Sequence, residues 1–469
     1  FFLSGVMVTL AATFLVVYNA DLILKPITLL GRRLGALLPS VKMAVAYPLS
    51  NKTRTGMTMA MFCLVVFALT VMSSMNHNFN RLFISDRALG GYDVVVDENP
   101  TNPIGDLRQA LATTGSPVTS QIDGVGMTSI IASGSATLCQ SPDGNPCPTN
   151  IDPKAQPAGA PKIDFAEYEV RGEDAGFFAS ANIALQSRAK GYADDKAVWA
   201  KVASDPSYAI IDAFALPANA DFGASGFTLK DIDEGAKEFE PIALTLRDPV
   251  SGKTQDLTVI GIIELGSSAS YTGLHVAEKT LLDVFGKPER HRYFVKTKEG
   301  ASNKEVAREI ESALLTTGAQ AESLRAQVDK QNAVNQGFFY LMQGFMGLGL
   351  FVGVAAVGVI AFRTVVERRQ QIGMLRALGY TRSMVGLTFM IESAFIAFMG
   401  LISGIVFALI LARQLITEEL ANQGGMSFSV PWVHVLVIGV LAFGFALLMT
   451  LIPSRQAAGI PIAEALRYE

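Results

Sequence analysis

The side chains best suited to chemistry in this sequence are scattered, and they do not form a recognisable catalytic set. Of the four histidines, His77 and His434 lie at the edges of long apolar stretches, while His275 and His291 stand alone in a polar region. A bound metal needs several His, Cys, Asp or Glu side chains at close spacing, and the sequence has no such cluster. We therefore expect no catalytic residue, no metal and no cofactor in this chain, and we do not expect it to be an enzyme; a membrane-anchored enzyme with an outer domain is the least favoured interpretation.

The segment "SGKT" at 251–254 matches only part of a phosphate-binding loop. That motif also needs a glycine five residues before its second glycine, and Arg247 occupies this position. The surrounding residues 242–263 alternate between apolar and polar, which predicts a β-hairpin with a polar turn instead of a strand followed by a helix. The sequence therefore predicts no nucleotide site in this chain.

A compact group of arginines lies in "ERRQQIGMLRALGYTRSMV" at 367–385, which holds four arginines and one glutamate between two long apolar stretches. On a helix beginning at Glu367, the apolar side chains form a broad arc, and Gly379 is placed to end the helix. A basic amphipathic helix tied to two spans is suited to contact with lipid headgroups. It is equally suited to docking into a groove on a soluble partner.

The composition shows which elements hold this segment. Half of the 469 residues are hydrophobic and 17% are charged, against about 25% charged in an average soluble domain. Crossing a bilayer takes roughly 20 apolar residues in a helix, and five stretches qualify: 1–24, 56–76, 337–362, 386–412 and 432–453. The expected fold class is a polytopic α-helical membrane protein with about five transmembrane helices and a large mixed α/β extracytoplasmic domain.

The distribution of charge predicts how these stretches are threaded, because short loops rich in Lys and Arg stay in the cytoplasm. Loop 25–55, which is expected to include an amphipathic helix, has six basic residues and no acid, and 363–385 has five arginines against Glu367. The connection 413–431 is richer in acid. We expect 25–55, 363–385 and the tail 454–469 in the cytoplasm, and the protein in the plasma or inner membrane.

The polar region is predicted to fold as the extracytoplasmic α/β domain over 90–322. Within it, 92–98 is expected to be a strand, and 292–318 a strand followed by an amphipathic helix whose start at Ser302 has a capping-box pattern. Residues 77–89 and 323–336 lack Pro and Gly, so they are expected to extend the adjoining spans as helical stalks.

Cys139 and Cys147 bracket the turn-rich segment "CQSPDGNPC" in this outer domain. Because the outer face is oxidising, a disulfide between them is favoured over two free thiols. The third cysteine, Cys63, lies inside an apolar stretch and is expected to be a packing residue.

Glu392 is the acidic residue placed deep within a predicted span. Burying a carboxylate at mid-bilayer costs about 2.5–3.5 kcal/mol on insertion scales, so a partner is expected. Pairing with Arg376 or Arg382 of the basic segment is favoured over proton transport. The motifs at 349–353 ("GLFVG") and 400–404 ("GLISG") place small residues four apart, which predicts close helix packing.

The basic segment, the following "IESAFIAFMGLISGIVFALILA" and the terminal "IPSRQAAGIPIAEALRYE" together resemble the end of FtsX-like ABC-transporter permeases. That family includes macrolide exporters and lipoprotein-releasing permeases. "AVAYPLSNKTRTGMTMAMFCLVVFAL" resembles its entry helix and first span. The layout of one span, an outer domain and three spans over 40–469 is also that of the family.

In that family the cytoplasmic loop between the second and third spans rests on a separate ATPase subunit. The resemblance therefore implies an ATPase-coupling segment made of Glu367, Arg368, Arg369, Ile372, Gly373, Met374, Leu375, Arg376, Leu378 and Gly379. Gln370 and Gln371 depart from the charges that members often carry there. The resemblance places ATP and Mg on the partner ATPase dimer.

The stretch 1–24 has no counterpart in a four-span unit. It fits the C-terminal half of a duplicated ten-span permease, with 1–24 as the linking helix and an N-terminal permease half or a second copy as partner. The expected function is mechanotransmission: ATP hydrolysis by the partner moves the outer domain, which acts on a lipid, lipoprotein, peptide or cell-envelope protein. The alternative is a membrane-anchored sensor with an outer ligand-binding domain. No nucleic acid is expected.

Overall fold

The computed structural model describes residues 2–19, 44, 48, 52–83, 88–141, 147–148, 165–222, 226–233, 235–417 and 428–461. These residues form two compact units, a helical unit and an α/β unit. Two long helices, α4 (Lys52–Phe83) and α11 (Leu324–Glu367), contribute residues to both. Each therefore continues past its membrane-length stretch, up to Phe83 in α4 and from Leu324 in α11.

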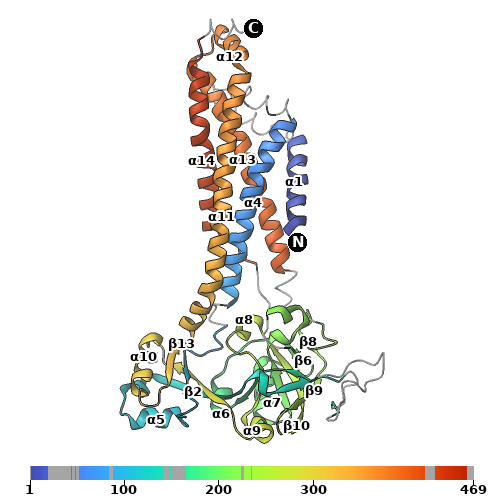
Figure 1. Ribbon diagram of the computed structural model, residues 1–469, viewed down its shortest axis with the longest axis vertical. Coiled ribbons are helices and arrows are strands. Elements are labelled where there is room, and N and C mark those ends of the chain that lie inside the picture. The colour runs from blue at the N-terminus through green and yellow to red at the C-terminus, as the bar shows by residue number, and fades with distance from the viewer. Residues whose placement is uncertain are drawn as a thin grey trace. The chain divides into compact units, whose positions relative to one another are not determined.

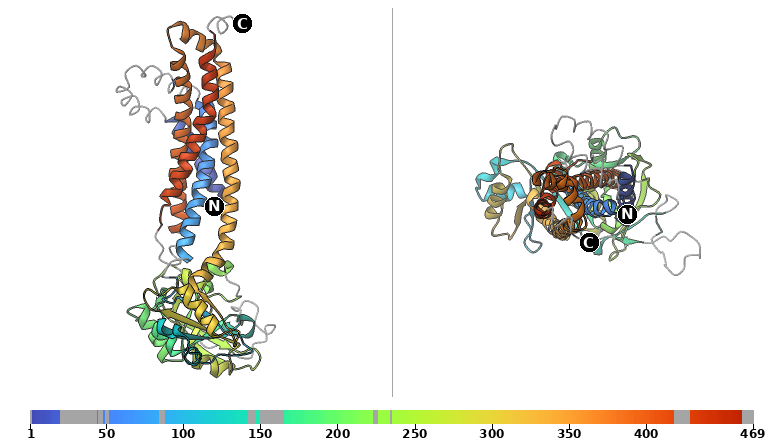
Figure 2. Two further views of the ribbon diagram at one scale, coloured as in Figure 1. Left: turned by 90° about the vertical axis from the view of Figure 1, so that its left-hand side faces the viewer. Right: turned by 90° about the horizontal axis from the view of Figure 1, so that it is seen from above.

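The helical unit is built from α4, α11, α13 (Arg382–Leu415) and α14 (Trp432–Gly459), which run side by side (Figures 1 and 2). Each contains an apolar segment long enough to cross a membrane: Thr55–Leu82, Gln336–Glu367, Arg382–Leu415 and Trp432–Gly459. A helix suits lipid because it satisfies its backbone hydrogen bonds internally. The short helix α12 (Arg369–Ala377) joins α11 to α13 at one end of the bundle (Figure 1).

Helix α1 (Phe2–Tyr18) is a further apolar helix, with 17 residues. A Cβ added at Gly5 would lie 2.8 Å from the side chain of Leu411 in α13, and Thr9 and Thr13 are buried on the same face. The helix is shorter than the roughly 20 residues that cross a bilayer, so the span over 1–24 stays a prediction. Most of loop 25–55 lies outside the described residues.

The motif at 400–404 packs as predicted. A Cβ at Gly404 would lie 2.8 Å from the carbonyl oxygen of Cys63 in α4, and a Cβ at Gly400 would lie 3.2 Å from the carbonyl oxygen of Met59. The side chain of Cys63 is fully buried, as expected for a packing residue. The motif at 349–353 does not make such a contact among the described residues. Gly349 has no neighbour within 4 Å, and a Cβ at Gly353 would meet only Val65 at 3.7 Å.

The α/β unit begins and ends with a split β-α-β fold of four antiparallel strands in the order β13-β1-β12-β2. Two helices cover one face of these strands around a buried apolar cluster. The elements are β1 (Val94–Asp97), α5 (Leu107–Thr113), β2 (Ile122–Ile131), β12 (Arg290–Thr297), α10 (Asn303–Ala313) and β13 (Gln320–Ser323).

The strand expected at 92–98, and the strand and helix expected within 292–318, are thus present. Ser302 takes the predicted N-cap position of α10, but its hydroxyl makes no capping hydrogen bond. The side chain of Asn303 instead joins Thr297 to Asp93, accepting from the former at 2.9 Å and donating to the latter at 3.0 Å. The capping-box prediction was wrong in this detail, because the helix start is tied to the sheet by a tertiary contact.

A larger insertion between β2 and β12 extends the same sheet in the order β5-β11-β7-β10-β9-β3-β4; in addition, β6 pairs with β10, and β8 pairs with β6. Its strands are β3 (Thr137–Cys139), β4 (Ala166–Glu167), β5 (Val170–Glu173), β6 (Leu185–Ala189), β7 (Tyr208–Ile211), β8 (Glu238–Phe239), β9 (Ile242–Arg247), β10 (Thr254–Ile263) and β11 (Leu274–Ala277). Its helices are α6 (Ala175–Ser180), α7 (Asp195–Ser204), α8 (Leu265–Ser268) and α9 (Glu278–Phe285).

The predicted hairpin at 242–263 is confirmed, because β9 and β10 pair antiparallel with Arg247 opposite Thr254. The "SGKT" segment therefore lies at a hairpin turn and does not form a phosphate loop. The predicted disulfide between Cys139 and Cys147 is also present, with Cα atoms 6.2 Å apart.

Candidate functional site

The basic segment folds as the short helix α12 between two long ones. Arg368 separates α11 from α12, with φ −100° and ψ 15°. At the other end, Gly379 has φ +102°, its N–H donates to the Arg376 carbonyl, and the Tyr380 N–H donates to the Leu375 carbonyl. These two bonds form a Schellman motif, which favours glycine because the left-handed conformation is costly for other residues. The predicted helix end at Gly379 is confirmed.

One face of α12 packs into the helical unit. Ile372 is 1% exposed and lies in an apolar cluster with Val365 of α11, Val385 of α13 and Ala457 of α14. Side chains from three of the long helices therefore share one buried cluster with Ile372 of α12. Such burial orients α12 on the bundle through apolar contacts.

Glu392 pairs with Arg368, the residue at the break between α11 and α12. The two terminal guanidinium nitrogens, Nη1 and Nη2, donate to the two carboxylate oxygens at 2.9 and 3.3 Å, and both side chains are about nine-tenths buried. The guanidinium also lies 5.6 Å from the ring centre of Phe389. A buried bidentate pair satisfies both charges at once.

Glu392 does pair with an arginine of the basic segment, as expected. The two arginines predicted as its partner, Arg376 and Arg382, were wrong, because the partner is Arg368. Arg382 precedes Glu392 by ten residues on the same helix, which places it about 15 Å away along the axis. Arg376 instead donates to the carbonyl oxygen of Ile460, at the C-terminal end of α14. Arg368 reaches Glu392 because the turn out of α11 directs it onto α13.

The other face of α12 is open in the described part of the chain. Leu378 is 81% exposed and Met374 is 51% exposed, four residues apart on the same helix face. The ten residues of the predicted coupling segment therefore fall into three groups. Arg368, Ile372 and Gly373 are buried, Arg369, Leu375 and Arg376 are half-buried, and Glu367, Met374, Leu378 and Gly379 are exposed. Contact of this segment with an ATPase stays a prediction.

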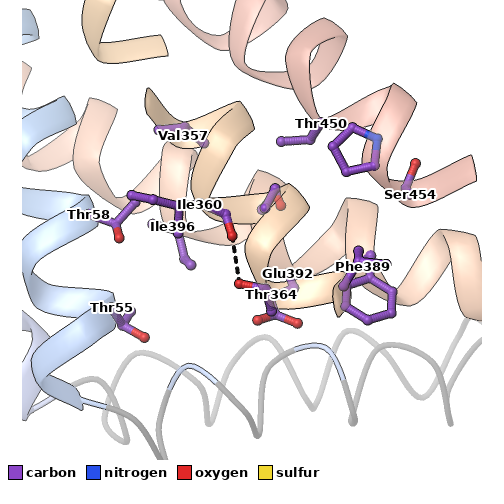
Figure 3. A pocket seen from close by; sticks show the side chains of 14 residues that line it. Thr55, Thr58, Val357, Ile360, Thr364, Phe389, Glu392, Ile396, Thr450 and Ser454 are labelled. Carbon is purple, nitrogen blue, oxygen red and sulfur yellow. Dashed lines mark hydrogen bonds between the residues drawn. The ribbon is translucent and has the colours of Figure 1, made fainter. Parts of the chain in front are cut away.

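A cavity of about 50 Å³ lies beside Glu392 among α4, α11, α13 and α14 (Figure 3). Its polar lining combines the carboxylate with hydroxyls from all four helices: Thr55, Thr58, Thr364, Ser393, Thr450 and Ser454. A water molecule needs about 10–15 Å³ of such volume, so the space suits a few waters. No sequence signal joins these hydroxyls, because they come from distant parts of the chain and each looks like an ordinary helix residue.

Two histidines of the α/β unit each lie next to a glutamate. His275 Nδ1 lies 2.7 Å from Glu173 Oε1, with both side chains fully buried, and His291 Nδ1 lies 2.5 Å from Glu98 Oε1. Among the described residues there is no group of three or more potential metal ligands. The interpretation of these two histidines as structural residues fits this arrangement.

The helical unit bears the family signature. Residues 344–462, which contain α12, α13 and α14, match the family described as FtsX-like permease C-terminal. This part of the chain carries the C-terminal domain of the FtsX-like permeases. The chain is a polytopic membrane protein with a large α/β extracytoplasmic domain.

Known relatives of this permease are similar over part of their length. An uncharacterized ABC transporter permease of Methanocaldococcus jannaschii is 28% identical over 238 residues, which cover 47% of this chain and 57% of that protein. The lipoprotein-releasing system transmembrane protein LolC of Neisseria meningitidis serogroup B is 30% identical over 142 residues, or 27% of this chain and 34% of LolC. The chain thus spans between a third and just over half of these relatives.

Part of the chain is also similar to a solved structure. This structure is the extracellular domain of the noncanonic ABC-type transporter YknZ from Gram-positive bacteria. The match covers 49% of the present chain and 98% of the YknZ domain, with 12% sequence identity and a TM-score of 0.25. A likeness at that level carries no argument about function.

Proposed function

We propose that this chain is the permease half of an ABC transporter that works by mechanotransmission. A separate pair of ATPase subunits hydrolyses ATP in the cytoplasm, and the resulting movement of α12 is passed through the spans to the extracytoplasmic domain. The second half of the permease is an N-terminal half or another copy. The cargo belongs to the lipid, lipoprotein, peptide or cell-envelope class, and the C-terminus is cytoplasmic.

The two faces of α12 are the observation that supports this proposal. One face is held to the bundle by Ile372 and Arg368, and the other presents Met374 and Leu378. Two exposed apolar side chains one turn apart are the anchors with which a helix docks into a groove on a partner. The proposed ATPase-docking surface is therefore narrower than the segment predicted from sequence, and consists of Met374, Leu378 and the neighbouring exposed residues.

The test changes this docking surface in the full chain. Met374→Glu with Leu378→Glu places charge where apolar contact is expected, while Met374→Leu with Leu378→Met keeps the surface apolar and serves as the matched control. The double Glu variant should lose co-purification of the ATPase and at least about tenfold of stimulated ATP hydrolysis. The control should retain both.

Wild-type ATPase binding and hydrolysis in the double Glu variant would contradict the proposal. Co-purification of a kinase or response regulator with the wild-type chain, in place of an ATPase, would favour the sensor alternative.

A further inference from the structure

Two arginines of the basic segment point inward, one at each end of α12. Arg368 stands immediately before its first residue and pairs with Glu392 of α13. Arg376 stands in its last turn and donates to Ile460, the residue that follows α14. The two contacts therefore hold opposite ends of one short helix to two different long helices.

Each contact suits its role chemically. The pair between Arg368 and Glu392 uses both terminal guanidinium nitrogens and both carboxylate oxygens, a geometry that resists rotation. Ile460 ends a helix, where carbonyl groups lack internal partners and the helix dipole favours a cation. Arg376 supplies both a donor and a positive charge at that end.

The outward arginines of the same region differ from these two. The Arg363 side chain is 76% exposed and forms an ion pair with Glu367 one turn away on its own helix. Arg382 is exposed in the first turn of α13. Contacts within one helix, or with solvent, do not join α12 to the bundle.

We propose that Arg368 and Arg376 are positioning residues, which fix α12 to α13 and α14 so that α12 and these helices move together. The role of this attachment in coupling rests on the proposed function. The attachment itself does not, because both of its contacts lie within this chain. Ile372, buried between the two arginines, completes a three-point attachment.

The attachment also connects a movement of α12 to α4, through the cavity beside Glu392. Glu392, held by Arg368, lines the cavity that Thr55 and Thr58 of α4 line from the opposite side (Figure 3). A displacement of α12 moves Glu392 with it and changes the width of this cavity. Because interiors otherwise pack closely, this cavity leaves room for α4 and α13 to approach or separate.

The test measures how firmly α12 is held in the full chain, reconstituted in lipid nanodiscs without any ATPase. Spin labels are attached to cysteines replacing Gln371 on α12 and Arg455 on α14, both exposed; the native Cys63 is buried. Pulsed electron paramagnetic resonance should give a narrow distance distribution. The distribution should broaden in Arg368→Glu and in Arg376→Met, and remain narrow in the control Arg382→Gln.

Rescue separates a specific pair from general damage. Arg368→Glu combined with Glu392→Arg should restore the narrow distribution, since the charges are exchanged in place. Narrow distance distributions in both single variants would overturn the proposal. It would also be overturned if the double variant Arg368→Glu with Glu392→Arg gave a distribution as broad as that of Arg368→Glu alone. If Arg368→Glu does not fold, Arg376→Met decides the same question.

The ATPase complex then tests the purpose of the attachment. Arg376→Met should bind the ATPase with an affinity close to that of the wild type, because Met374 and Leu378 are unchanged, yet lose about tenfold of stimulated hydrolysis. Unchanged hydrolysis with a broadened distribution would remove the role in coupling. Failure of the wild-type chain to bind an ATPase would instead count against the proposed function and leave the attachment standing.

Discussion

Asn78 holds both backbone groups of Ser429, a residue 351 positions away in the chain. The Ser429 N–H donates to Asn78 Oδ1 at 2.9 Å, and Asn78 Nδ2 donates to the Ser429 carbonyl at 2.9 Å. Asn78 is 1% exposed. An amide side chain has a hydrogen-bond donor and an acceptor next to each other, so it can bind a backbone N–H and C=O as a neighbouring β-strand would. It thereby ties α4 to the residues that precede α14.

Replacing Asn78 by Asp should release Ser429. The Asp oxygen that takes the place of Nδ2 would face the carbonyl oxygens of Ser429 and Ser74, both of which now accept from Nδ2. Losing a buried donor costs about 1–3 kcal/mol. Hydrogen exchange at the Ser429 amide should accelerate accordingly. Ser429→Ala is the control, since both bonds use only its backbone, and equal protection in all three proteins would contradict this account.

Gly404→Ala should weaken the contact between α4 and α13. The added methyl group would lie 2.8 Å from the Cys63 carbonyl oxygen, a backbone atom that cannot turn away, so the helices must separate. Overpacking of this kind costs about 1–3 kcal/mol. Gly444→Ala is the matched control, because it has no neighbour within 4 Å. Thermal unfolding in detergent should show a lower midpoint only for Gly404→Ala, and equal midpoints would argue against tight packing there.

The stability of the α/β unit should depend on Asp212. Burial raises the pKa of Asp212 to about 6 from an ordinary value of 3.8, although Gly273 and Phe214 N–H groups and the Tyr168 hydroxyl donate to it. The folded state therefore binds the proton more tightly than the unfolded state. This contribution is fully present below pH 3.8 and is lost as the pH rises through about 6. Two pKa units correspond to about 3 kcal/mol.

Guanidinium unfolding can measure this dependence through the fluorescence of the buried Trp199, with Trp432 replaced by Phe. Between pH 4 and pH 7, the free energy of unfolding of the protein with Asp212 should fall by about 2–3 kcal/mol relative to Asp212→Asn. A difference between the two proteins that does not change with pH would show that Asp212 does not titrate in this range.

The disulfide between Cys139 and Cys147 should stabilise the same unit. On the chain-entropy model, closing so short a loop contributes about 2–3 kcal/mol. Replacing both cysteines by serine should lower the free energy of unfolding by this amount in the Trp199 assay. A reducing agent should produce the same loss in the native chain and none in the double serine variant. Insensitivity of the native chain to reduction would contradict the expected contribution.

The sequence determined the features whose causes are local. The apolar stretches predicted the long helices, the alternation at 242–263 predicted the hairpin, and Gly379 predicted the end of α12. The spacing of Cys139 and Cys147 predicted their bond. In each case the residues that decide the outcome lie within a few positions of one another, so chain connectivity alone brings them together.

Only the tertiary structure decided which side chains meet across elements. The sequence contains several arginines that could pair with Glu392, and the turn at the end of α11 places Arg368 next to it. The same turn directed Arg376 inward and left Met374 and Leu378 exposed, which divided a single predicted coupling segment into an attached face and an open one. The hydroxyls around the cavity come from four helices, and β2 and β12 pair across a long insertion. Such contacts depend on how helices and strands pack in space, and residue spacing along the chain does not specify that.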